Sequence, residues 1–418
     1  MRHLPVVIIG GGQAGLSVSY YLKQRNVEHV VLEKDQAFHA WRSQRWDSFC
    51  LVTPNWQCRL PGLPYDGDDP EGFMRRDELN AYLDRFLAKL NPPLEEGVRV
   101  QRVKRAPDGT FELQTSRGEL RADQVVIAAG SYHVPKIPRL AEKLPPSITQ
   151  LHVSQYRSPS QLPEGAVLVV GTGQSGAQIA EDLHLENRQV HLCVGSAPRV
   201  ARRYRGRDVV AWLEDMGHYE LGVDRHPLKE GVRDKANHYV TGRDGGRDID
   251  LRKFALEGMQ LHGRLLEIEH GQLRFGDDLR QNLDNADTVS ANNKKSIDDY
   301  IARSNIVAPR EEPYQPVWQP AQAPANSLDL AAANITSVVW CMGFASDFGW
   351  LELPVFDGRG KPVHERGVCQ QDGVYFVGLP WLHTWGSGRF SGVARDAEHV
   401  VQQLAKRLRA TSHDALLS

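Results

Sequence analysis

The sequence predicts an α/β fold with two parallel sheets, each carrying a nucleotide-binding turn. A run of β-branched residues at 5–9 leads into a glycine-rich turn at 10–15, and a helical stretch follows. The same order recurs 161 positions later, with an apolar run at 166–170 and a turn at 171–176. Both turns have the spacing G-x-G-x-x-G between a buried strand and a helix. These parts make a Rossmann-like dinucleotide-binding domain, so the chain is predicted to hold two of them.

Two further strands indicate how the domains are nested. Apolar runs at 125–130 and 338–343 both end in glycine, one before and one after the second turn, and such strands suit crossings between domains. We therefore expect a first domain made from residues 1–155 and 330–418. The second domain, residues 160–329, is expected to be inserted in the first. It is expected to carry helical or irregular decoration, whose elements its polar sequence does not define.

The first turn has the features of an FAD site. Gly10 permits the tight turn, Gly12 lets the backbone approach a pyrophosphate, and Gly15 lets the helix pack against the strand. The helix N-terminus supplies free N–H groups and a partial positive charge to the phosphates. Glu33 lies 18 positions beyond Gly15, at the end of the next strand. There its carboxylate can accept the hydroxyls of an adenosine ribose.

The second turn ends differently and predicts NADPH. Eighteen positions beyond Gly176 stands Val194, and no acid follows it. Ser196 and Arg199 come next, at the start of an arginine-rich segment. A carboxylate there would repel a 2′-phosphate, whereas serine and arginine would bind one. The alternative is that these arginines form a solvated basic loop.

Composition excludes several other functions. The 418 residues include 50 Lys and Arg against 52 Asp and Glu, and the net charge of −2 gives no reason to expect nucleic acid as a partner. No apolar run approaches the ~18 residues of a membrane span. The five cysteines form no C-x-x-C or C-x-x-x-x-C pair, which argues against a disulfide reductase and fits a reducing cytoplasm. Without an H-E-x-x-H motif or paired cysteines, no metal site is predicted.

The sequence also resembles the single-component, NADPH-dependent flavin monooxygenases over nearly its whole length. The stretch 171–181 is similar to the family's NADPH turn, and 342–344 is similar to its T-G-Y linker. His152 and Tyr156 match the end of its F-x-G-x-x-x-H-x-x-x-Y fingerprint. The stretch 45–56 looks like a bacterial branch of uncharacterised flavin-dependent oxidoreductases. The resemblance implies two nested dinucleotide domains that bind FAD and NADPH.

The resemblance further implies a monooxygenase. NADPH would reduce FAD, and a flavin hydroperoxide would transfer oxygen to a small organic substrate by N- or S-oxygenation or a Baeyer–Villiger reaction. Pro146 and Ile148 replace the phenylalanine and glycine of the fingerprint, which supports a reductase or oxidase without oxygenation as an alternative. A non-enzymatic flavin-bound regulator is the third reading. The expected partners are the substrate and oxygen, and a homodimer is possible.

One candidate catalytic residue comes from the resemblance. Thr53-Pro54-Asn55 resembles the family's T-N segment with one residue inserted, so Asn55 is expected beside the oxygen-reactive face of the flavin. The alternative is that Asn55 closes a turn after proline. Trp41 and Arg42 fall where the family's chain covers FAD, and the helix start at Ser391 is expected to face the flavin's pyrimidine edge. The other residues expected to contact the cofactors are Gln13, Ala14, Lys34, Ala129, Gly130, Gly171, Gly173, Gln174, Ser175 and Gly343.

Overall fold

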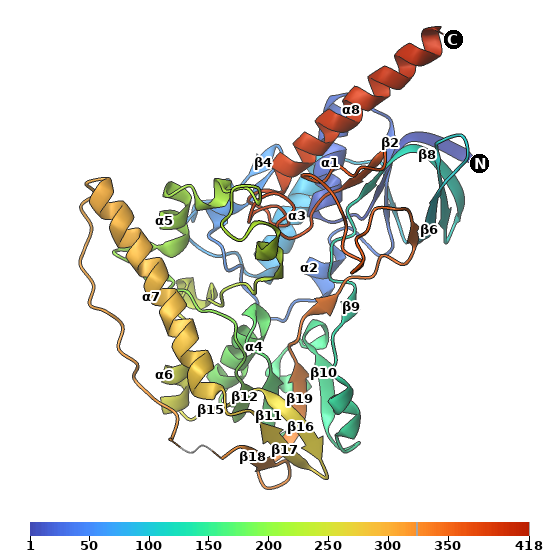
Figure 1. Ribbon diagram of the computed structural model, residues 1–418. Helices are drawn as coiled ribbons and strands as arrows, with labels where there is room; N and C mark the ends of the chain where they lie inside the picture. The colour runs from blue at the N-terminus through green and yellow to red at the C-terminus, as the bar shows by residue number, and fades with distance from the viewer. Residues whose placement is uncertain (323–324, 418) are drawn as a thin grey trace.

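The protein folds into two bodies, each built around a sheet (Figure 1). The computed structural model describes residues 1–322 and 325–417, with side chains up to residue 409. The first sheet lies in the upper body of Figure 1 and the second in the lower body. Between them, β9 (Val134–Pro135) pairs antiparallel with β20 (Phe344–Ala345), so the two chain crossings lie side by side.

The first sheet has eight strands that come from both ends of the chain, in the order β21-β6-β7-β8-β1-β2-β5, with β22 also paired to β8. The central strand β1 is parallel to both β2 and β8. Val6 and Ile8 of β1 pack into one apolar cluster and Val7 and Ile9 into another, as expected of a strand buried on both faces. The strands are β1 (Arg2–Ile9), β2 (His29–Glu33), β5 (Leu94–Glu96), β6 (Val100–Arg105), β7 (Phe111–Thr115), β8 (Gly118–Ile127), β21 (Leu351–Glu352) and β22 (Val374–Phe376).

Three helices cover one face of this sheet. They are α1 (Gln13–Gln24), α3 (Arg76–Leu90) and α8 (Val393–Leu417). Their apolar residues join Val6 and Ile8 in one cluster because the helices present hydrophobic stripes at helical spacing. Helix α8 continues outward beyond the body, toward the C-terminus (Figure 1). Short elements complete this region: α2 (His39–Ser43), the 3₁₀ turn η1 (Asn55–Gln57), β3 (Arg59–Leu60) and β4 (Leu63–Pro64).

The second sheet is a five-stranded parallel sheet in the order β10-β19-β11-β12-β15. Its strands are β10 (Thr149–His152), β11 (Ala166–Val170), β12 (Val190–Cys193), β15 (Gln260–His262) and β19 (Ile335–Trp340). Helix α4 (Gln174–Leu185) follows β11, as the second glycine turn predicts. An antiparallel sheet of β16 (Leu265–Glu269), β17 (Gln272–Phe275) and β18 (Ser327–Asp329) lies beside it.

The sheets place the domain boundaries one strand away from the predicted positions. Both β10 and β19 belong to the second sheet, although residues up to 155 and from 330 were expected in the first domain. The reason is that each sheet has its own strand ending in a glycine. Strand β8 leads to Gly130 in the first sheet, and β19 leads to Gly343 in the second. The nested arrangement is as expected, but the chain crosses at β9 and β20.

The decoration of the second body contains helices that the sequence does not reveal. They are α5 (Val209–Asp215), α6 (Leu251–Leu256) and the 25-residue α7 (Leu279–Arg303). Helix α7 buries only a sparse set of residues, including Leu283 and Ile297, which explains why its polar sequence shows no clear period. The remaining elements are β13 (Arg203–Tyr204), β14 (Arg207–Asp208) and the 3₁₀ turns 139–143, 153–155, 159–161, 218–220, 229–234 and 243–245. Within the described ranges, no helix has the length and apolar character to cross a membrane.

Candidate active site

The first glycine turn, between β1 and α1, is closed tightly around its own backbone. Gly10 has a φ of +117°, and a Cβ there would lie 2.4 Å from the carbonyl oxygen of Ala128. A Cβ on Gly15 would lie 1.9 Å from the carbonyl oxygen of Gly10. Gly12 differs, because nothing lies within 4 Å of where its Cβ would be. The turn thus leaves open space in front of the helix N-terminus, which is the shape that a pyrophosphate needs.

Glu33 stands beside this turn at the end of β2. Its carboxylate accepts hydrogen bonds from the backbone N–H groups of Gly11, at 2.7 Å, and Asp35, at 2.9 Å. These bonds fix the side chain next to the turn, where the ribose of a dinucleotide would come within reach. Lys34 is exposed, and its Nζ lies 3.9 Å from the Asp35 carboxylate. Ala14 is buried at the start of α1.

Gln13, the first residue of α1, links the turn to two distant segments. Its Oε1 accepts the indole N–H of Trp41 at 3.0 Å, and its Nε2 donates to the carbonyl of Gly388 at 3.1 Å. Trp41 also packs on Phe390, with ring centroids 5.0 Å apart. The predicted Trp41 and the C-terminal segment therefore meet at the N-terminus of α1.

Two side chains here have buried polar atoms without a hydrogen-bond partner. Both amide atoms of Gln57 lack a hydrogen bond although the residue is only 1% exposed, and the Ser391 hydroxyl is likewise unpartnered. The backbone N–H of Arg59 donates to the carbonyl of Phe390 at 3.1 Å, so the segments that carry Gln57 and Ser391 are neighbours. A buried amide without a partner costs free energy unless a ligand satisfies it. These groups fit the polar edge of a flavin. Sequence reasoning missed Gln57, because its neighbours give no sign that it is buried.

Asn55, the predicted catalytic residue, is hydrogen-bonded at both ends of its side-chain amide. Its Nδ2 donates to the carbonyl of Asp69 at 2.9 Å, and its Oδ1 accepts from the backbone N–H of Met74 at 2.7 Å. Its own N–H donates to the carbonyl of Gly72. Since both ends of the amide hold the loop from residue 69 to 74, the geometry favours the alternative in which Asn55 closes a turn.

The second glycine turn, between β11 and α4, repeats the first. Gly171 has a φ of +106°, with the carbonyl oxygen of Cys341 only 2.7 Å from a built Cβ. A Cβ on Gly176 would lie 2.0 Å from the Gly171 carbonyl oxygen, whereas Gly173 again faces open space. Gln174 donates to the carbonyl of Val240 at 2.5 Å, so the decoration packs over this turn. The half-buried Ser175 completes the turn.

The arginine predicted to bind a 2′-phosphate is already paired. Arg199 is 4% exposed, and its Nε donates to Asp287 of α7 at 2.6 Å. Its guanidinium also lies over the ring of Tyr314, at 4.2 Å. Ser196, in contrast, is exposed just beyond β12. A phosphate at Arg199 would have to displace Asp287, which the unrecognised helix α7 brings to it. The neighbouring Arg202 and Arg205 are paired with Asp208 and Asp298.

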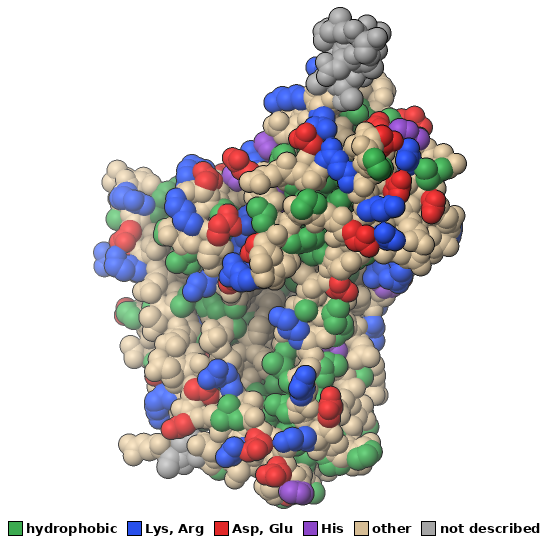
Figure 2. Space-filling model, turned by 45° about the vertical axis from the view of Figure 1, so that its right-hand side comes forward, with side chains coloured by type: hydrophobic (Ala, Val, Ile, Leu, Met, Phe, Trp, Pro, Cys, Tyr) green, Lys and Arg blue, Asp and Glu red, His purple; other side chains and the backbone are tan. Residues whose placement is uncertain are grey.

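The two chain crossings meet beside the cleft. Gly130 and Gly343 both have positive φ, +74° and +76°, and both face open space. The ring of His152 makes a 3.0 Å hydrogen bond to the carbonyl oxygen of Gly343 and packs edge-on against Phe344. The half-buried Ala129 precedes Gly130. His152 of the fingerprint thus anchors the second crossing. Figure 2 shows the surface hollowed between the two bodies.

Asp182 of α4 fixes the two bodies against each other. Its carboxylate accepts the hydroxyls of Tyr156, at 2.6 Å, and of Ser48, at 2.5 Å, and pairs with Arg243 at 2.6 Å. Ser48 belongs to the first body, and Arg243 belongs to the decoration of the second. A buried carboxylate with three partners is stable in this position because each partner offsets its lost hydration. It sets the relative orientation of the two turns.

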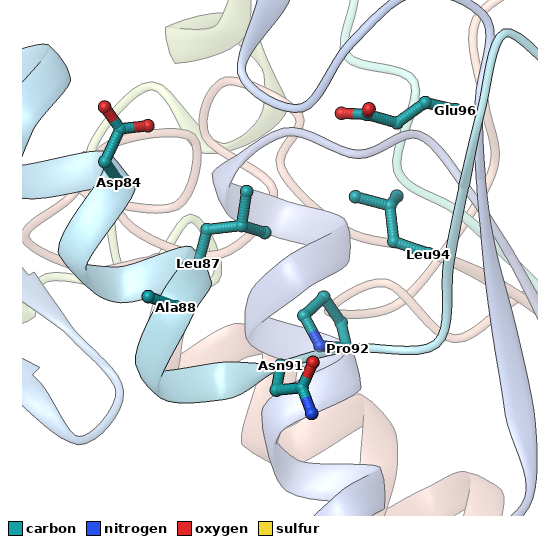
Figure 3. Close-up of a pocket in the computed structure, with 7 residues that line it drawn as sticks. All are labelled: Asp84, Leu87, Ala88, Asn91, Pro92, Leu94 and Glu96. Carbon is teal, nitrogen blue, oxygen red and sulfur yellow. The ribbon is translucent and has the colours of Figure 1, made fainter.

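A separate pocket of about 430 Å³ lies between α3 and β5 (Figure 3). Arg42, which the sequence places over FAD, donates to Asp84 of this pocket at 2.5 Å and to the carbonyl of Ala37 at 2.9 Å. The pocket contains two carboxylates, Asp84 and Glu96, which disfavour a phosphate, and it has no glycine turn. The cleft between the two turns is therefore the candidate active site. The pocket is lined by Asp84, Leu87, Ala88, Asn91, Pro92, Leu94 and Glu96.

The cysteines do not form a redox centre. All five are free and buried. Burial raises the pKa of the Cys58, Cys341 and Cys369 thiols to about 12, so they are protonated at neutral pH and poor nucleophiles. Across residues 1–322 and 325–417, no group of three His, Cys, Asp or Glu side chains could hold a metal ion.

Comparison with known proteins identifies the family. Residues 7–222 match the family described as pyridine nucleotide-disulphide oxidoreductase. An uncharacterized CzcO-like oxidoreductase from Geobacillus kaustophilus is 31% identical over 408 residues, which cover 97% of this chain and 99% of the relative. The chain belongs to the pyridine nucleotide-disulphide oxidoreductase family. The uncharacterized oxidoreductase CzcO of Bacillus subtilis is 29% identical over 95% of this chain and 98% of its own.

Other oxidoreductases extend the comparison. A flavin-containing monooxygenase from Stenotrophomonas maltophilia has a TM-score of 0.61 at 21% identity and covers 98% of this chain and 100% of its own. An ornithine N-hydroxylase from Kutzneria, solved with reduced FAD and NADP⁺, has a TM-score of 0.61 at 18% identity over 97% of this chain and 100% of its own. Indole-3-pyruvate monooxygenase YUCCA1 of Oryza sativa subsp. japonica is 31% identical over 47% of this chain and 49% of its own. The predicted fold class and the predicted membership of an oxidoreductase family are confirmed.

Proposed function

We propose that this oxidoreductase is an FAD-dependent monooxygenase that uses NADPH. The observation that carries the proposal is the pair of equivalent turns, each with an open glycine at a helix N-terminus, in two bodies that share one cleft. A hydride donor in the second turn and a flavin in the first can meet only where such bodies face each other. The main competing reaction of this fold is disulfide reduction, which needs a reactive cysteine pair. The buried, protonated cysteines argue against it.

Each cofactor has a set of residues that fit it. For FAD, Gly12 and the first N–H groups of α1 would bind the pyrophosphate, and Glu33 would bind the ribose. Gln57 and Ser391 would satisfy the polar edge of the flavin ring. When bound, FAD supplies the electron storage and the reaction with oxygen. For NADPH, Gly173 would lie at the pyrophosphate and the exposed Ser196 near the 2′-phosphate.

The chain's own groups would orient the reactants and limit water. Trp41 and Phe390 form an apolar wall at the N-terminus of α1, held by Gln13. Asp182 holds the two bodies at a fixed orientation, which hydride transfer requires because it depends on distance and stacking. Two similar proteins, an ornithine N-hydroxylase and an indole-3-pyruvate monooxygenase, are oxygenases by name, and this supports an oxygenase reaction here.

The second candidate is an NADPH-dependent reductase or oxidase. The observation that favours it concerns Asn55, which was predicted to donate a hydrogen bond beside the flavin. Its side-chain amide is instead hydrogen-bonded to the loop from residue 69 to 74. A non-enzymatic flavin regulator has less support, since both turns keep open phosphate sites.

One experiment separates these candidates. The FAD-loaded protein is reduced with NADPH under anaerobic conditions and then mixed rapidly with oxygen. A monooxygenase gives a transient spectrum distinct from both oxidised and reduced flavin, and little peroxide forms per NADPH when a substrate is present. Direct return to oxidised flavin with one peroxide per NADPH, across nitrogen, sulfur and ketone substrates, would support an oxidase.

A further inference from the structure

Two arginines in the cleft lack a carboxylate partner. Arg45 and Arg389 are half-buried, and neither forms an ion pair with any acidic side chain among the described residues. Most other enclosed arginines of the chain are paired, as Arg199 is with Asp287. An enclosed cation without an anion is costly, so the structure retains these two against a penalty.

Aromatic rings hold both guanidinium groups in place. Arg45 lies 4.6 Å from the ring centroid of Trp41, and Arg389 lies 3.9 Å from that of Trp385. Trp41 in turn packs on Phe390, which follows Arg389 directly in the chain. Arg389 donates from Nη1 to the carbonyl of Trp385 and from Nη2 to Asn237, and Arg45 donates from Nη1 to the carbonyl of Gln44. Each of these nitrogens carries a second N–H, so both guanidinium groups keep N–H donors with which to bind an anion.

The residues around the two arginines come from several segments that border the cleft. Arg389 donates to the Oδ1 of Asn237 at 2.8 Å, and Asn237 belongs to the inserted domain. Tyr132, two residues before β9 and 61% exposed, lies within electrostatic range of both guanidinium groups. Tyr219 packs on Trp385 with ring centroids 4.6 Å apart. The arginines are thus set among aromatic side chains.

Burial lowers the pKa of the Arg45 guanidinium to about 10 and that of Arg389 in the same direction. Both groups remain cations at neutral pH. Their surroundings contain uncompensated positive charge, which attracts an anion to this part of the cleft.

We propose that Arg45 and Arg389 bind the carboxylate of the substrate, so that the molecule oxidised here is a small organic acid with a flat, aromatic or conjugated body. The proposal rests on the proposed function, because it names the substrate class of the same site. A cofactor phosphate offers the same anionic oxygens. The carboxylate is favoured because each glycine turn already provides open backbone N–H groups for a pyrophosphate.

The test measures binding to the oxidised, FAD-loaded protein, which needs no turnover. Benzoate, phenylacetate and indole-3-acetate are each compared with the corresponding neutral amide by titrating the flavin absorption spectrum. We expect at least one acid to bind about tenfold or more tightly than its amide, since a charge-assisted bidentate contact is lost in the amide. If no acid binds better than its amide, the proposal is wrong.

Variants assign the preference to the two arginines. R45M and R389M should each reduce the preference for the acid about tenfold, and R389K should retain part of it, because lysine keeps the charge without the fork. R310M removes an exposed arginine from the loop after α7 and should change nothing. Unfolding midpoints and FAD content show whether each variant is folded, and R389K serves if R389M is not.

The same variants distinguish the two sources of anion. If R45M or R389M loses FAD, or raises the NADPH concentration needed for half-maximal flavin reduction while the preference for the acid persists, the arginines bind cofactor phosphates and the proposal is overturned. Failure of the oxygenase proposal would instead appear as peroxide release on mixing with oxygen, with the binding preference for the acid intact.

Discussion

The two glycine turns have one backbone geometry and different surroundings. In both, the first and third glycines would clash with backbone carbonyls if they carried a Cβ, and the middle glycine faces open space. Past the second strand, the first turn has Glu33 held by two backbone N–H groups, whereas the second has an exposed serine and no acid. We therefore expect phosphate binding to depend on the turn itself, and the choice of nucleotide to depend on residues about twenty positions later.

The largest expected effect comes from variants that block the phosphate site of one glycine turn and leave the other turn intact. Gly12 and Gly173 have extended backbone, with ψ of −173° and 175°, so valine fits both positions without strain. G12V should fold, yet its side chain would occupy the pyrophosphate space and lower FAD affinity on the order of 100-fold, or about 2.7 kcal/mol. G173V should keep its FAD and lose NADPH-driven flavin reduction. Flavin absorbance per protein and reduction rates measure both.

Each of these variants is the control for the other. G15V should not fold at all, because its Cβ would lie 1.9 Å from a carbonyl oxygen. A G12V protein that is yellow with a full complement of FAD would contradict the placement of the pyrophosphate at this turn.

The second expected effect concerns the acid-free turn. R199A removes a buried partner of Asp287, so we expect a loss of about 3 kcal/mol in the free energy of unfolding and an unchanged ratio of NADPH to NADH use. S196E places an acid close to the position in the second unit that corresponds to Glu33 in the first, and it should raise the Michaelis constant for NADPH about tenfold without affecting stability. Urea unfolding with excess FAD and steady-state kinetics check both. If R199A is stable and has a higher Michaelis constant for NADPH but not for NADH, Arg199 binds the 2′-phosphate after all.

The third expected effect separates ligand binding from stability in the first region. Gln57 has two unpartnered amide atoms, so Q57L should stabilise the FAD-free protein by about 1–2 kcal/mol and weaken FAD binding about tenfold. Q124L is the matched control. Gln124 is equally buried but bonds to Tyr375 and Leu404, so its loss should lower stability and leave FAD affinity unchanged. If Q57L lowers stability without affecting FAD, its amide has no role at the flavin.

The sequence predicts what depends on local spacing. The strands, turns and helices of both nucleotide units occur where the glycines indicate, because a positive φ and a close helix–strand contact require glycine at fixed positions. Contacts between distant segments are not encoded in that way. Asp287 reaches Arg199 from a polar helix 88 positions away, and the Asn55 amide is used by a loop 14 to 19 positions on. The basic segment predicted to bind phosphate is therefore largely internal to the second body.

The smallest expected effect concerns α8, which packs against α1 of the first body. Asp396, in the first turn of α8, is 2% exposed, and burial raises its pKa to about 6. In the unfolded chain this carboxyl ionises near pH 3.8, so between about pH 4 and 6 the folded state holds a proton that the unfolded state has lost. Stability from this group is thus present at low pH, falls as pH rises through this window, and is absent above it. The shift corresponds to at most about 3 kcal/mol.

We expect Asp396 to change the free energy of unfolding by about 1 kcal/mol across this pH window. The change is smaller than the upper bound because the helix N-terminus favours the charged carboxylate. D396N can still accept the hydrogen bond of the Ser387 hydroxyl but cannot ionise. Its free energy of unfolding should match the wild type near pH 4 and exceed it by about 1 kcal/mol at pH 8. Urea unfolding at half-unit pH steps, with saturating FAD, gives the difference between the two curves and removes the contribution of other groups. If D396N is instead less stable at pH 8, the folded protein favours the ionised carboxylate and does not raise the pKa of Asp396. Arg366, 3.9 Å away, together with the helix end, would then outweigh its burial.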